Sequence, residues 1–454
     1  MDQQQQQQQP GQHQHDDPDF LTEDDVLEVE ELNVEGDQPM DDSDDDQMDD
    51  GDDDDGDRID EDDEQRDNAM DLLDSGFDDS VAVTSLHTSP EGGAVFALAI
   101  HPFTSSLAVS GGEDNTAYIF RTDTGAQVAQ LGGHSDSVTC VGWSHDGALC
   151  ATGGMDGRVR VWKVRRRSQE EQWEECGWEL AVALEGPDEV NGEAQWIDWH
   201  PKGNVLLAGG ADGTVWVWNL PKGDTMHVLA GHTAPVTAGR FTPDGKKILT
   251  ASEDSMLILW DPRSGQPEWK LTSSDARFAL ESGINTLAIN PASTVAILGG
   301  AEGGLRAVNL TKGEVLAQME GHEEGASVEA VAFNEISTGA GGGASVQVIV
   351  SVGTDGRVCT WEAAGFKLRS TGSHEDAVTS LSFSPHTPHF LTGSADKTLK
   401  LWDYRTGSCL RTILGNRDII HAVAVSRDGR VAVSGTEDGS VRTFRLDQEA
   451  RTVG

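Results

Sequence analysis

Short runs in which apolar and polar residues alternate recur along the chain from about residue 81 onward. In RVRVWKV at 158–164 the apolar side chains fall between Arg and Lys, which is the period of a half-buried strand. Other strand-like runs are Met226–Leu229, Val236–Phe241 and Lys247–Ser252, separated by turn residues such as Pro243-Asp244-Gly245. The pattern predicts four short strands per unit and an all-β chain.

Eight copies of one unit can be aligned on a single spacing. Each copy has an acidic residue six positions before a bulky residue, with alternating apolar residues between them. Asp beside Gly or Asn forms tight turns between strands, so the acid marks the turn between the second and third strands. The acids are Asp114, Asp156, Asp212, Asp254, Glu302, Asp355, Asp396 and Asp438, and the bulky residues are Phe120, Trp162, Trp218, Trp260, Val308, Trp361, Trp402 and Phe444.

Two further landmarks share this frame. A Ser or Thr stands four residues before most of the turn acids, and Gly-His or Ser-His precedes the first strand in four units. The His lies 22 residues before the turn acid in units two, four and seven, and 33 residues before it in unit six. The extra residues of unit six fall in NEISTGAGGGAS, which we interpret as a Gly-rich loop between the first two strands.

These landmarks resemble the WD40 family. In that family the His, the hydroxyl residue, the Asp and the Trp form a hydrogen-bonded line through each blade of a propeller. The third and fifth units have Ala208 and Leu298 at the hydroxyl position, so we expect those blades to be less rigidly braced. The full sets are His134/Thr152/Asp156/Trp162, His232/Thr250/Asp254/Trp260, His322/Ser351/Asp355/Trp361 and His374/Thr392/Asp396/Trp402.

The repeat count and the two ends predict an eight-bladed β-propeller over residues 81–454, preceded by a tail at 1–80. The chain stops ten residues after Phe444, which leaves little room for a fourth strand in the last blade. Ser80–His87 alternates like a strand and has no unit of its own. We therefore expect residues 80–87 to supply the outer strand of the eighth blade, which removes a sheet edge.

Charge separates the two regions. Residues 1–80 hold 34 acids and two bases, hence -32 of the total -47, and residues 81–454 carry the other -15. The tail, with its run Gln3–Gln9 and its blocks of Asp, has too few apolar residues to offset its ordering entropy. We expect it to be disordered.

The acidic balance also excludes classes of partner. Nucleic-acid binding needs clustered Lys and Arg, and the one basic run, Arg165–Arg167, is followed at once by glutamates. No apolar stretch approaches the ~18 residues of a membrane helix, and the N-terminus resembles no secretory or mitochondrial signal. The five cysteines have irregular spacing and no CxxC pair, so we interpret them as reduced packing residues.

Catalytic motifs are missing from the sequence. It contains no GxSxG, no phosphate-binding loop, no HExxH and no paired-cysteine metal spacing. Four histidines repeat at a structural position, and a turn acid present eight times indicates architecture. We therefore expect no enzyme activity, no cofactor and no metal site.

A second set of acids offers a binding surface. These acids follow the His position, or its equivalent, in six units, on loops that in the WD40 family lie at the usual binding face. Converging there, they would focus negative potential and suit a basic protein or peptide; the alternative is that they are ordinary solvated loop acids. They are Asp136, Glu189, Glu193, Glu281, Glu323, Glu324, Glu375, Asp376 and Asp418.

The order of the motifs, the eight units and the Asp-rich leader together resemble the angio-associated migratory cell protein family. Its fungal relatives include a dedicated chaperone of a basic large-subunit ribosomal protein. This resemblance implies cytoplasmic protein binding and, as in the fungal branch, capture of a newly made ribosomal protein by its basic N-terminus. We also expect a monomer that has access to the nucleus. The alternative is a general signalling or ubiquitin-ligase scaffold with no preference for basic partners.

Overall fold

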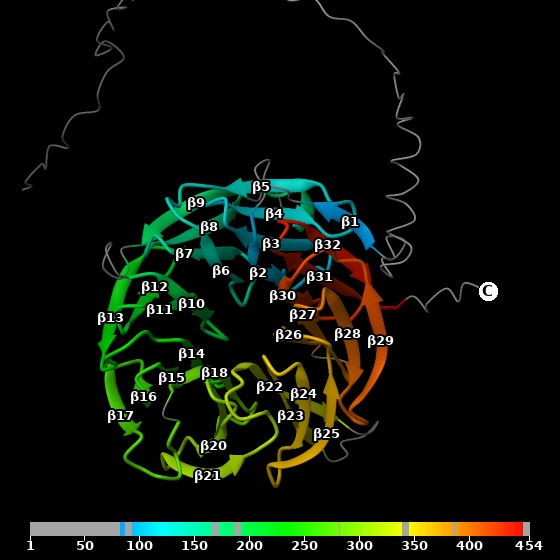
Figure 1. Cartoon of the computed structure of the whole chain (residues 1–454). Helices are drawn as coiled ribbons and strands as arrows, with labels where there is room; N and C mark the ends of the chain where they lie inside the picture. Colours follow the sequence, from blue (N-terminus) through cyan, green and yellow to red (C-terminus); the bar gives the residue numbers. More distant parts are fainter. Residues whose placement is uncertain are drawn as a thin grey trace, which may run out of the picture. The chain divides into compact units, whose positions relative to one another are not determined.

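The computed structural model describes residues 82–86, 93–165, 172–184, 186, 192–280, 282–337, 345–384 and 387–447. Within these residues the chain forms eight four-stranded antiparallel sheets and one short 3-10 helix, η2 (Trp173–Glu175). The all-β, eight-bladed fold expected from the repeats is confirmed (Figure 1). The expected disorder of residues 1–80 falls outside the described residues.

Each sheet is one blade, and its strands follow one another from the ring centre outward. Blades 1 to 4 contain β2 (Val95–Ile100), β3 (Leu107–Gly112), β4 (Ala117–Arg121), β5 (Gln127–Leu131); β6 (Val138–Trp143), β7 (Leu149–Gly154), β8 (Val159–Arg165), β9 (Gly177–Leu184); β10 (Ala194–Trp199), β11 (Val205–Gly210), β12 (Thr214–Asn219), β13 (Asp224–Ala230); and β14 (Ala238–Phe241), β15 (Ile248–Ala251), β16 (Leu257–Asp261), β17 (Gln266–Leu271). Blades 5 to 8 contain β18 (Ile284–Ile289), β19 (Val295–Gly300), β20 (Leu305–Asn309), β21 (Glu314–Met319); β22 (Val328–Ser337), β23 (Ser345–Gly353), β24 (Arg357–Glu362), β25 (Lys367–Ser373); β26 (Val378–Phe383), β27 (His389–Ser394), β28 (Thr398–Asp403), β29 (Ser408–Leu414); and β30 (Ile420–Val425), β31 (Val431–Thr436), β32 (Val441–Arg445), β1 (Ala82–Leu86).

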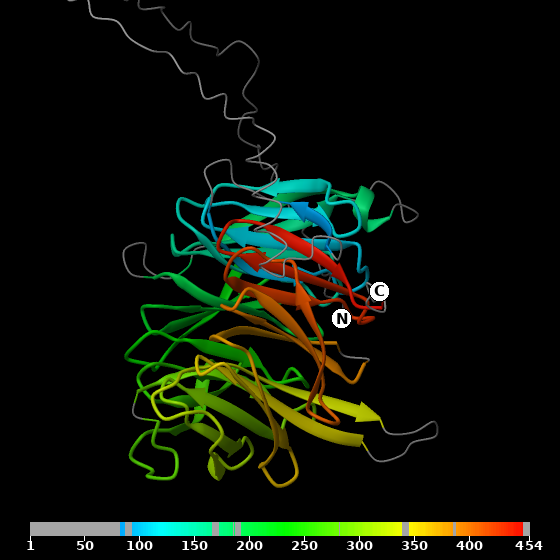
Figure 2. The same ribbon diagram turned by 45° about the vertical axis from the view of Figure 1, so that its right-hand side comes forward.

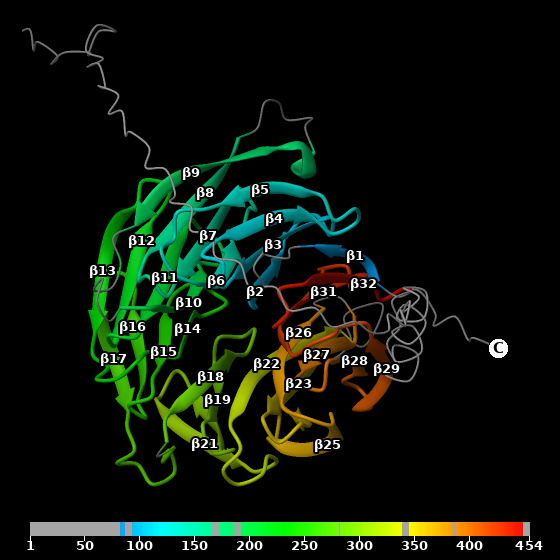
Figure 3. The same ribbon diagram turned by 45° about the horizontal axis from the view of Figure 1, so that its top comes forward.

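The eight innermost strands form the wall of the ring. Each of β2, β6, β10, β14, β18, β22, β26 and β30 contacts the next, and β30 contacts β2 again. Figures 2 and 3 view the same ring obliquely, with the sheets succeeding one another around it. Every sheet therefore has a neighbour on both faces.

The core lies between the blades, because each sheet presents apolar side chains to both neighbours. Between blades 7 and 8, for example, Leu391 and Leu399 pack with Ile420, Ala432 and Phe444 in one buried cluster. The bulky residues that end the third strands are buried in the same way, and Trp218, Trp260 and Trp361 are at most 1 % exposed. All five cysteines are free thiols, and four of them are buried.

The turns between the second and third strands form as their sequence predicts. In blade 2, Asp156 accepts a hydrogen bond from the Arg158 amide at 3.0 Å, and Gly157 has a φ of 71°. A left-handed residue at this place favours glycine, since a Cβ would crowd the following carbonyl. The Asp-Gly pair therefore stands at the centre of the four-residue turn, 155–158, that joins β7 to β8.

The two ends of the propeller meet in blade 8. Strand β1 pairs antiparallel with β32, with Ala82 opposite Phe444 and Leu86 opposite Val441. Figures 1 and 3 show β1 beside β32, although more than 350 residues separate them. The eighth sheet thus takes its outer strand from the start of the propeller.

Blade 6 differs from its expected form. The first two strands extend as far as Ser337 and from Ser345, so Asn334–Ser337 of the expected Gly-rich loop is strand. Asn334 pairs with Val348, because the alternation continues through the polar residues. The chain divides into two compact units after Glu61, a boundary that falls within the residues that are not described. The boundary at 80/81 stays a prediction.

Among the described residues, none of the helical structure has the length and apolar character that crossing a membrane requires.

Removal of residues 81–87 should strongly destabilise the propeller. The deletion exposes the edge of β32 and removes the backbone hydrogen bonds of a five-residue strand, each worth about 1 kcal/mol. We expect the free energy of unfolding to fall by about 3–5 kcal/mol, measured by thermal and denaturant unfolding. Removal of residues 1–75 is the control and should leave stability unchanged. Equal melting temperatures for the full chain and an 88–454 variant would contradict this role of β1.

Candidate functional site

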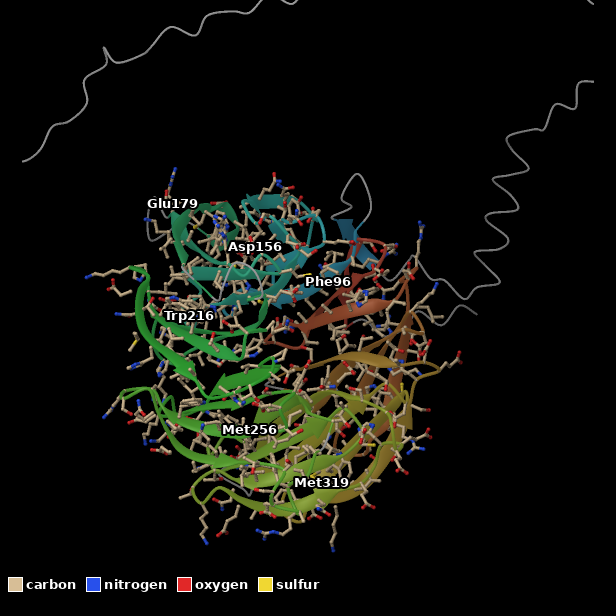
Figure 4. The ribbon with its side chains drawn as sticks, turned by 60° about the vertical axis from the view of Figure 1, so that its left-hand side comes forward. Phe96, Asp156, Glu179, Trp216, Met256 and Met319 are labelled. Carbon is tan, nitrogen blue, oxygen red and sulfur yellow. The ribbon has the colours of Figure 1, made fainter. Side chains whose placement is uncertain are left out.

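One end of the ring carries both sets of singled-out residues. It is formed by the loops that join the outer strand of one blade to the inner strand of the next, together with the turns between second and third strands. Figure 4 labels Asp156 on one such turn, between β7 and β8. We call this end the His-loop face, after the histidines on four of its loops.

In blade 7 four side chains form a continuous hydrogen-bonded chain. Trp402 Nε1 donates to Thr392 Oγ1 at 2.8 Å, and Thr392 Oγ1 lies 2.7 Å from His374 Nε2. His374 Nδ1 lies 2.9 Å from a carboxylate oxygen of Asp396. The chain therefore runs from the third strand across the second strand to the loop and the turn.

The same chain recurs in blades 2, 4 and 6, where the bridging hydroxyls belong to Thr152, Thr250 and Ser351. The His Nδ1–Asp distances are 3.0, 3.1 and 3.1 Å, the His Nε2–hydroxyl distances 2.9, 2.8 and 2.9 Å, and the Trp Nε1–hydroxyl distances 3.3, 2.9 and 2.9 Å. All four sets named from the sequence are thus brought together.

The bridging hydroxyl residues lie inside the blades and take no part in a binding surface. Thr152 and Thr250 are both 0 % exposed, and each lies on a second strand between the loop histidine and the tryptophan of the third strand. No ligand at the His-loop face can therefore contact them. Their place in the candidate site is that of internal supports for the histidine loops.

One arrangement of protons satisfies every group in the chain. The Trp N–H donates to the hydroxyl oxygen, the hydroxyl donates to His Nε2, and the His Nδ1–H donates to the carboxylate. This arrangement needs a neutral imidazole. In agreement with it, burial lowers the pKa of His232, although Asp254 opposes that shift.

The Asp carboxylate that ends each hydrogen-bonded series also holds the backbone of the His loop. In blade 7, Asp396 accepts the amides of Glu375 at 3.1 Å and Thr398 at 2.9 Å, and equivalent amide pairs bind the carboxylates of blades 2, 4 and 6. Burial raises the pKa of Asp396, but the hydrogen bonds from His374 and Thr398 outweigh burial and leave it well below its ordinary value. The pKa values of Asp156 and Asp355 are lowered by the same balance.

Blade 5 holds its loop without this chain. Counting back 22 residues from Glu302 reaches Leu280, and Leu280, Leu298 and Val308 occupy the His, hydroxyl and Trp positions. All three are at most 6 % exposed and belong to one apolar cluster. The polar set is therefore replaced as a whole, which avoids an unpaired buried polar group. Whether the blade is less rigid stays a prediction.

Blade 8 shows a partial version of the chain. Asn416 stands at the His position and accepts the hydroxyl of Ser434 at 2.7 Å, while the third strand ends in Phe444. In blade 1 the hydroxyl of Ser110 is buried and has no partner among the described residues.

The predicted partner-binding acids divide into described and undescribed residues. Glu189 and Glu281 lie outside the described residues. The other seven occupy the loops of the His-loop face and are exposed, except that Asp418 is partly buried. The structure thus places them on one face of the ring, and their binding role stays a prediction.

Local contacts already occupy some of these carboxylates. Asp136, Asp376 and Asp418 each accept the amide of the next residue at 2.7–2.9 Å. Glu323 forms an ion pair with Arg357 at 2.6 Å, and a carboxylate oxygen of Asp418 lies 3.9 Å from Lys397 Nζ. Among the described residues Glu193, Glu324 and Glu375 have no ion pair, so their negative charge is available to a ligand.

Three further acids on this face were missed by the sequence analysis. Glu113, Glu253 and Glu437 stand directly before the turn acid, and all three are exposed. Their amides donate to Ala94, Pro235 and Ile419 carbonyl oxygens at 2.9–3.1 Å, which places each one against the preceding loop. Their shared position before the turn acid was a signal that the alignment of repeats could have revealed.

Cations on this face occupy three kinds of position: the joining loops (Arg277, paired with Asp275, and Arg417), a turn (Lys397) and third strands. Lys400 donates to the Ser373 carbonyl at 2.9 Å, and Arg357 donates to the Gly321 carbonyl at 3.2 Å. Arg160 and Arg442 make the equivalent contact with Gly133 and Gly415. Carbonyl oxygens thus hold these four cations on the third strands, away from Glu193, Glu324 and Glu375.

One carboxyl with a raised pKa lies away from this face. Asp198, on the inner strand β10, accepts the Phe241 amide at 2.8 Å, and burial raises its pKa to about 6 despite the charge of Arg240. It borders a cavity of about 270 Å³ lined by residues of blades 3 to 6. In the described part of the chain no group of three or more His, Cys, Asp or Glu side chains could hold a metal ion.

Comparison with known families identifies the repeats. The model of the family described as "WD domain, G-beta repeat" matches residues 79–121, 125–163, 183–219, 223–261, 365–403 and 407–445. The human angio-associated migratory cell protein is 32% identical over 390 residues, covering 83% of this chain and 82% of its own. An uncharacterised WD repeat-containing protein of Schizosaccharomyces pombe is 34% identical over 358 residues, covering 77% and 84%.

Solved structures with the same fold include Sqt1 from two fungi. Sqt1 of Chaetomium thermophilum has a TM-score of 0.71 at 24% identity and covers 80% of this chain and 98% of its own. The same protein bound to the N-terminus of the ribosomal protein L10 has a TM-score of 0.70, covering 80% and 100%, again at 24% identity. Sqt1 of Saccharomyces cerevisiae has a TM-score of 0.69 at 20% identity, covering 81% and 100%. At these identities the likeness shows the fold.

Loss of a bridging hydroxyl should destabilise a blade that has the Trp–hydroxyl–His–Asp series of hydrogen bonds. It should have little effect on the stability of a blade that lacks this series. Ser351→Ala leaves the N–H of Trp361 and Nε2 of His322 buried without partners, and we expect a loss of about 1–3 kcal/mol in unfolding free energy. Ser110→Ala is the matched control, since Ser110 has the same strand position and its hydroxyl has no partner among the described residues. Chemical denaturation measures both variants. Equal losses would show that the hydrogen bonds of Ser351 carry no special stability.

The turn carboxylates should make the propeller sensitive to acid. Their folded pKa values lie below the unfolded value near 4, so their stabilisation is complete above that pH and is lost as pH falls through the folded values. Asp396→Asn should be less stable at pH 7 by about 1–3 kcal/mol and should lose less stability than the wild type between pH 4 and 2.

Denaturation midpoints across pH 2–7 test this expectation. Asp212→Asn in blade 3 is the control, because Asp212 is exposed and bonds only to Thr214. Parallel pH profiles for wild type and Asp396→Asn would contradict the role of the turn carboxylate.

Proposed function

Because the chain belongs to the WD40-repeat family and, within it, to the angio-associated migratory cell protein family, we propose that it is a non-enzymatic chaperone for a large-subunit ribosomal protein. WD40 propellers are typically protein-interaction folds without catalytic activity. In this proposal the His-loop face captures a Lys/Arg-rich segment of the ribosomal protein during ribosome assembly. The chaperone acts as a monomer in the cytoplasm, with access to the nucleus.

The observation that carries the proposal is the set of acids on the inner loops of the His-loop face. Glu193, Glu324 and Glu375 come from the loops that lead into blades 3, 6 and 7, and none has an ion pair among the described residues. Glu113 and Glu253 extend the set to blades 1 and 4, whereas Glu437 of blade 8 is paired with His421. Ammonium and guanidinium groups form charge-assisted hydrogen bonds with such carboxylates.

The face is also braced for binding. The hydrogen-bonded chains of four blades fix the loops, so that little conformational entropy is lost when a ligand binds. A flexible basic segment could contact several loops at once, which suits an unfolded N-terminus of a newly made protein. The solved Sqt1 complex with the N-terminus of the ribosomal protein L10 supports this choice of partner.

Reversing the charge of the three glutamates without an ion pair, Glu193, Glu324 and Glu375, should weaken binding of a basic segment. We expect Glu193→Lys/Glu324→Lys/Glu375→Lys to bind an N-terminal peptide of the organism's own ribosomal protein L10 about tenfold to a hundredfold less tightly, since each exposed charge contributes up to ~1 kcal/mol. Wild-type affinity should also fall steeply with salt. Isothermal titration at several salt concentrations measures both effects.

The matched control makes the same change of charge elsewhere. Asp224→Lys/Glu314→Lys/Glu362→Lys alters three exposed acids at the other ends of the strands, and it should bind the peptide as the wild type does. Equal loss in both triple variants would show a long-range charge effect without a site on the His-loop face.

Purification of the native complex separates the chaperone from a scaffold. One stoichiometric basic ribosomal protein in the purified complex supports the proposal. A set of signalling or ubiquitin-ligase components, without such a protein, would overturn it in favour of a general scaffold.

A further inference from the structure

A continuous groove lies between blades 8 and 1, at the end of the ring opposite the His-loop face. Two cavities of about 330 and 350 Å³ form it, and they share Ser105 and Asp428. The turns that line it join first to second strands and third to fourth strands. The groove runs from the inner strands to the end of β32.

The lining of this groove combines an exposed aromatic ring with unpaired cations. Phe103 is 59 % exposed, the largest exposed fraction among the large apolar side chains that the structure describes, and its ring meets the edge of His101. Arg430 and Arg445 are exposed and form no ion pair with another described residue.

Three acids line the groove, and two of them are engaged in local contacts, whereas Asp447 is exposed. Asp123 forms an ion pair with Arg121, and Asp428 accepts the hydroxyl of Ser426 and the amide of Arg430. The groove therefore combines apolar surface with two exposed arginines, Arg430 and Arg445, and one exposed carboxylate, Asp447.

The chain enters the propeller at the outer end of the groove. Ala82, the first residue of β1, pairs with Phe444, and Arg445 is the next residue of β32. Strands lie about 4.8 Å apart, so β30 and the groove turn that follows it are about 14 Å from β1. The five steps along the chain from residue 77 to residue 82 span up to ~17 Å when extended.

The residues that lead into β1 complement the groove. Their sequence is DLLDSGFDDS at 71–80, with four aspartates and three large apolar residues. Phe77 is one of only two aromatic residues in the first 81; the other is Phe20. Aromatic and acidic side chains thus stand within reach of Phe103 and the two arginines.

We propose that residues 71–79 fold back along this groove as an intramolecular ligand. Phe77 packs against Phe103 and His101, and Asp78 and Asp79 face Arg430 and Arg445. The contact anchors the segment on the side of the ring away from the His-loop face. It also covers the exposed Phe103 and leaves the acidic loops accessible to a basic partner.

Photocross-linking in the full chain tests the contact. A benzophenone amino acid replaces Phe77, the protein is irradiated at micromolar concentration, and the cross-linked peptides are mapped by mass spectrometry. We expect cross-links within the chain to residues 101–106 or 427–430, with a yield that falls at least fivefold in 1 M NaCl. The same photoreactive residue at Phe20 is the control and should give no such cross-link.

Charge variants test whether the cross-link depends on the two arginines of the groove. Arg430→Glu/Arg445→Glu should lower the cross-link yield at least fivefold. Lys222→Glu/Lys312→Glu, which makes the same change at exposed turns of blades 3 and 5, should leave the yield unchanged. Equal yields in the two double variants would overturn the proposal, as would cross-links that join only isotopically distinct copies of the chain.

Discussion

Closure of the ring is the constraint on which the rest of the structure depends. Each sheet buries apolar side chains against two neighbours, so an open ring would expose the faces of two blades and one strand edge. The pairing of β1 with β32 supplies the missing strand. It also determines that the chain enters the propeller at the end of β32, beside Arg445. The groove and the His-loop face lie at opposite ends of the same sheets because of that geometry.

Closure brings the loops together, and the hydrogen-bonded chains hold them. In four blades a Trp, a hydroxyl, a His and an Asp join third strand, second strand, loop and turn. Blade 5 forms the same strands and turn with Leu280, Leu298 and Val308 packed at the His, hydroxyl and Trp positions. Both solutions obey one rule, since a buried polar group must have a partner or be absent. Blades 1 and 8 depart from this rule in part, because the buried Ser110 hydroxyl has no partner among the described residues and blade 8 keeps only the Ser434–Asn416 pair.

The sequence predicted the blade frame well because that frame rests on local chemistry repeated eight times. The spacing of 22 residues identified His374 and Asp396 as partners before any coordinates. Other features depend on side-chain conformation or on distant contacts. The Glu323–Arg357 ion pair, which removes one predicted acid from the free set, follows from rotamers that spacing does not determine. The long β22–β23 hairpin continues through polar residues whose pairing only the tertiary structure shows.

The acidic loops are a cost to stability that the bracing makes tolerable. Like charges around a closed ring repel one another, and among the described residues Glu193, Glu324 and Glu375 have no ion pair to offset that repulsion. The turn carboxylates differ, because each accepts backbone amides and a histidine. Acids with structural partners and acids without them thus occupy adjacent positions on the same loops. A cationic ligand would relieve the repulsion and stabilise the folded ring by mass action. That coupling links the uncompensated charge of the face to a function in binding.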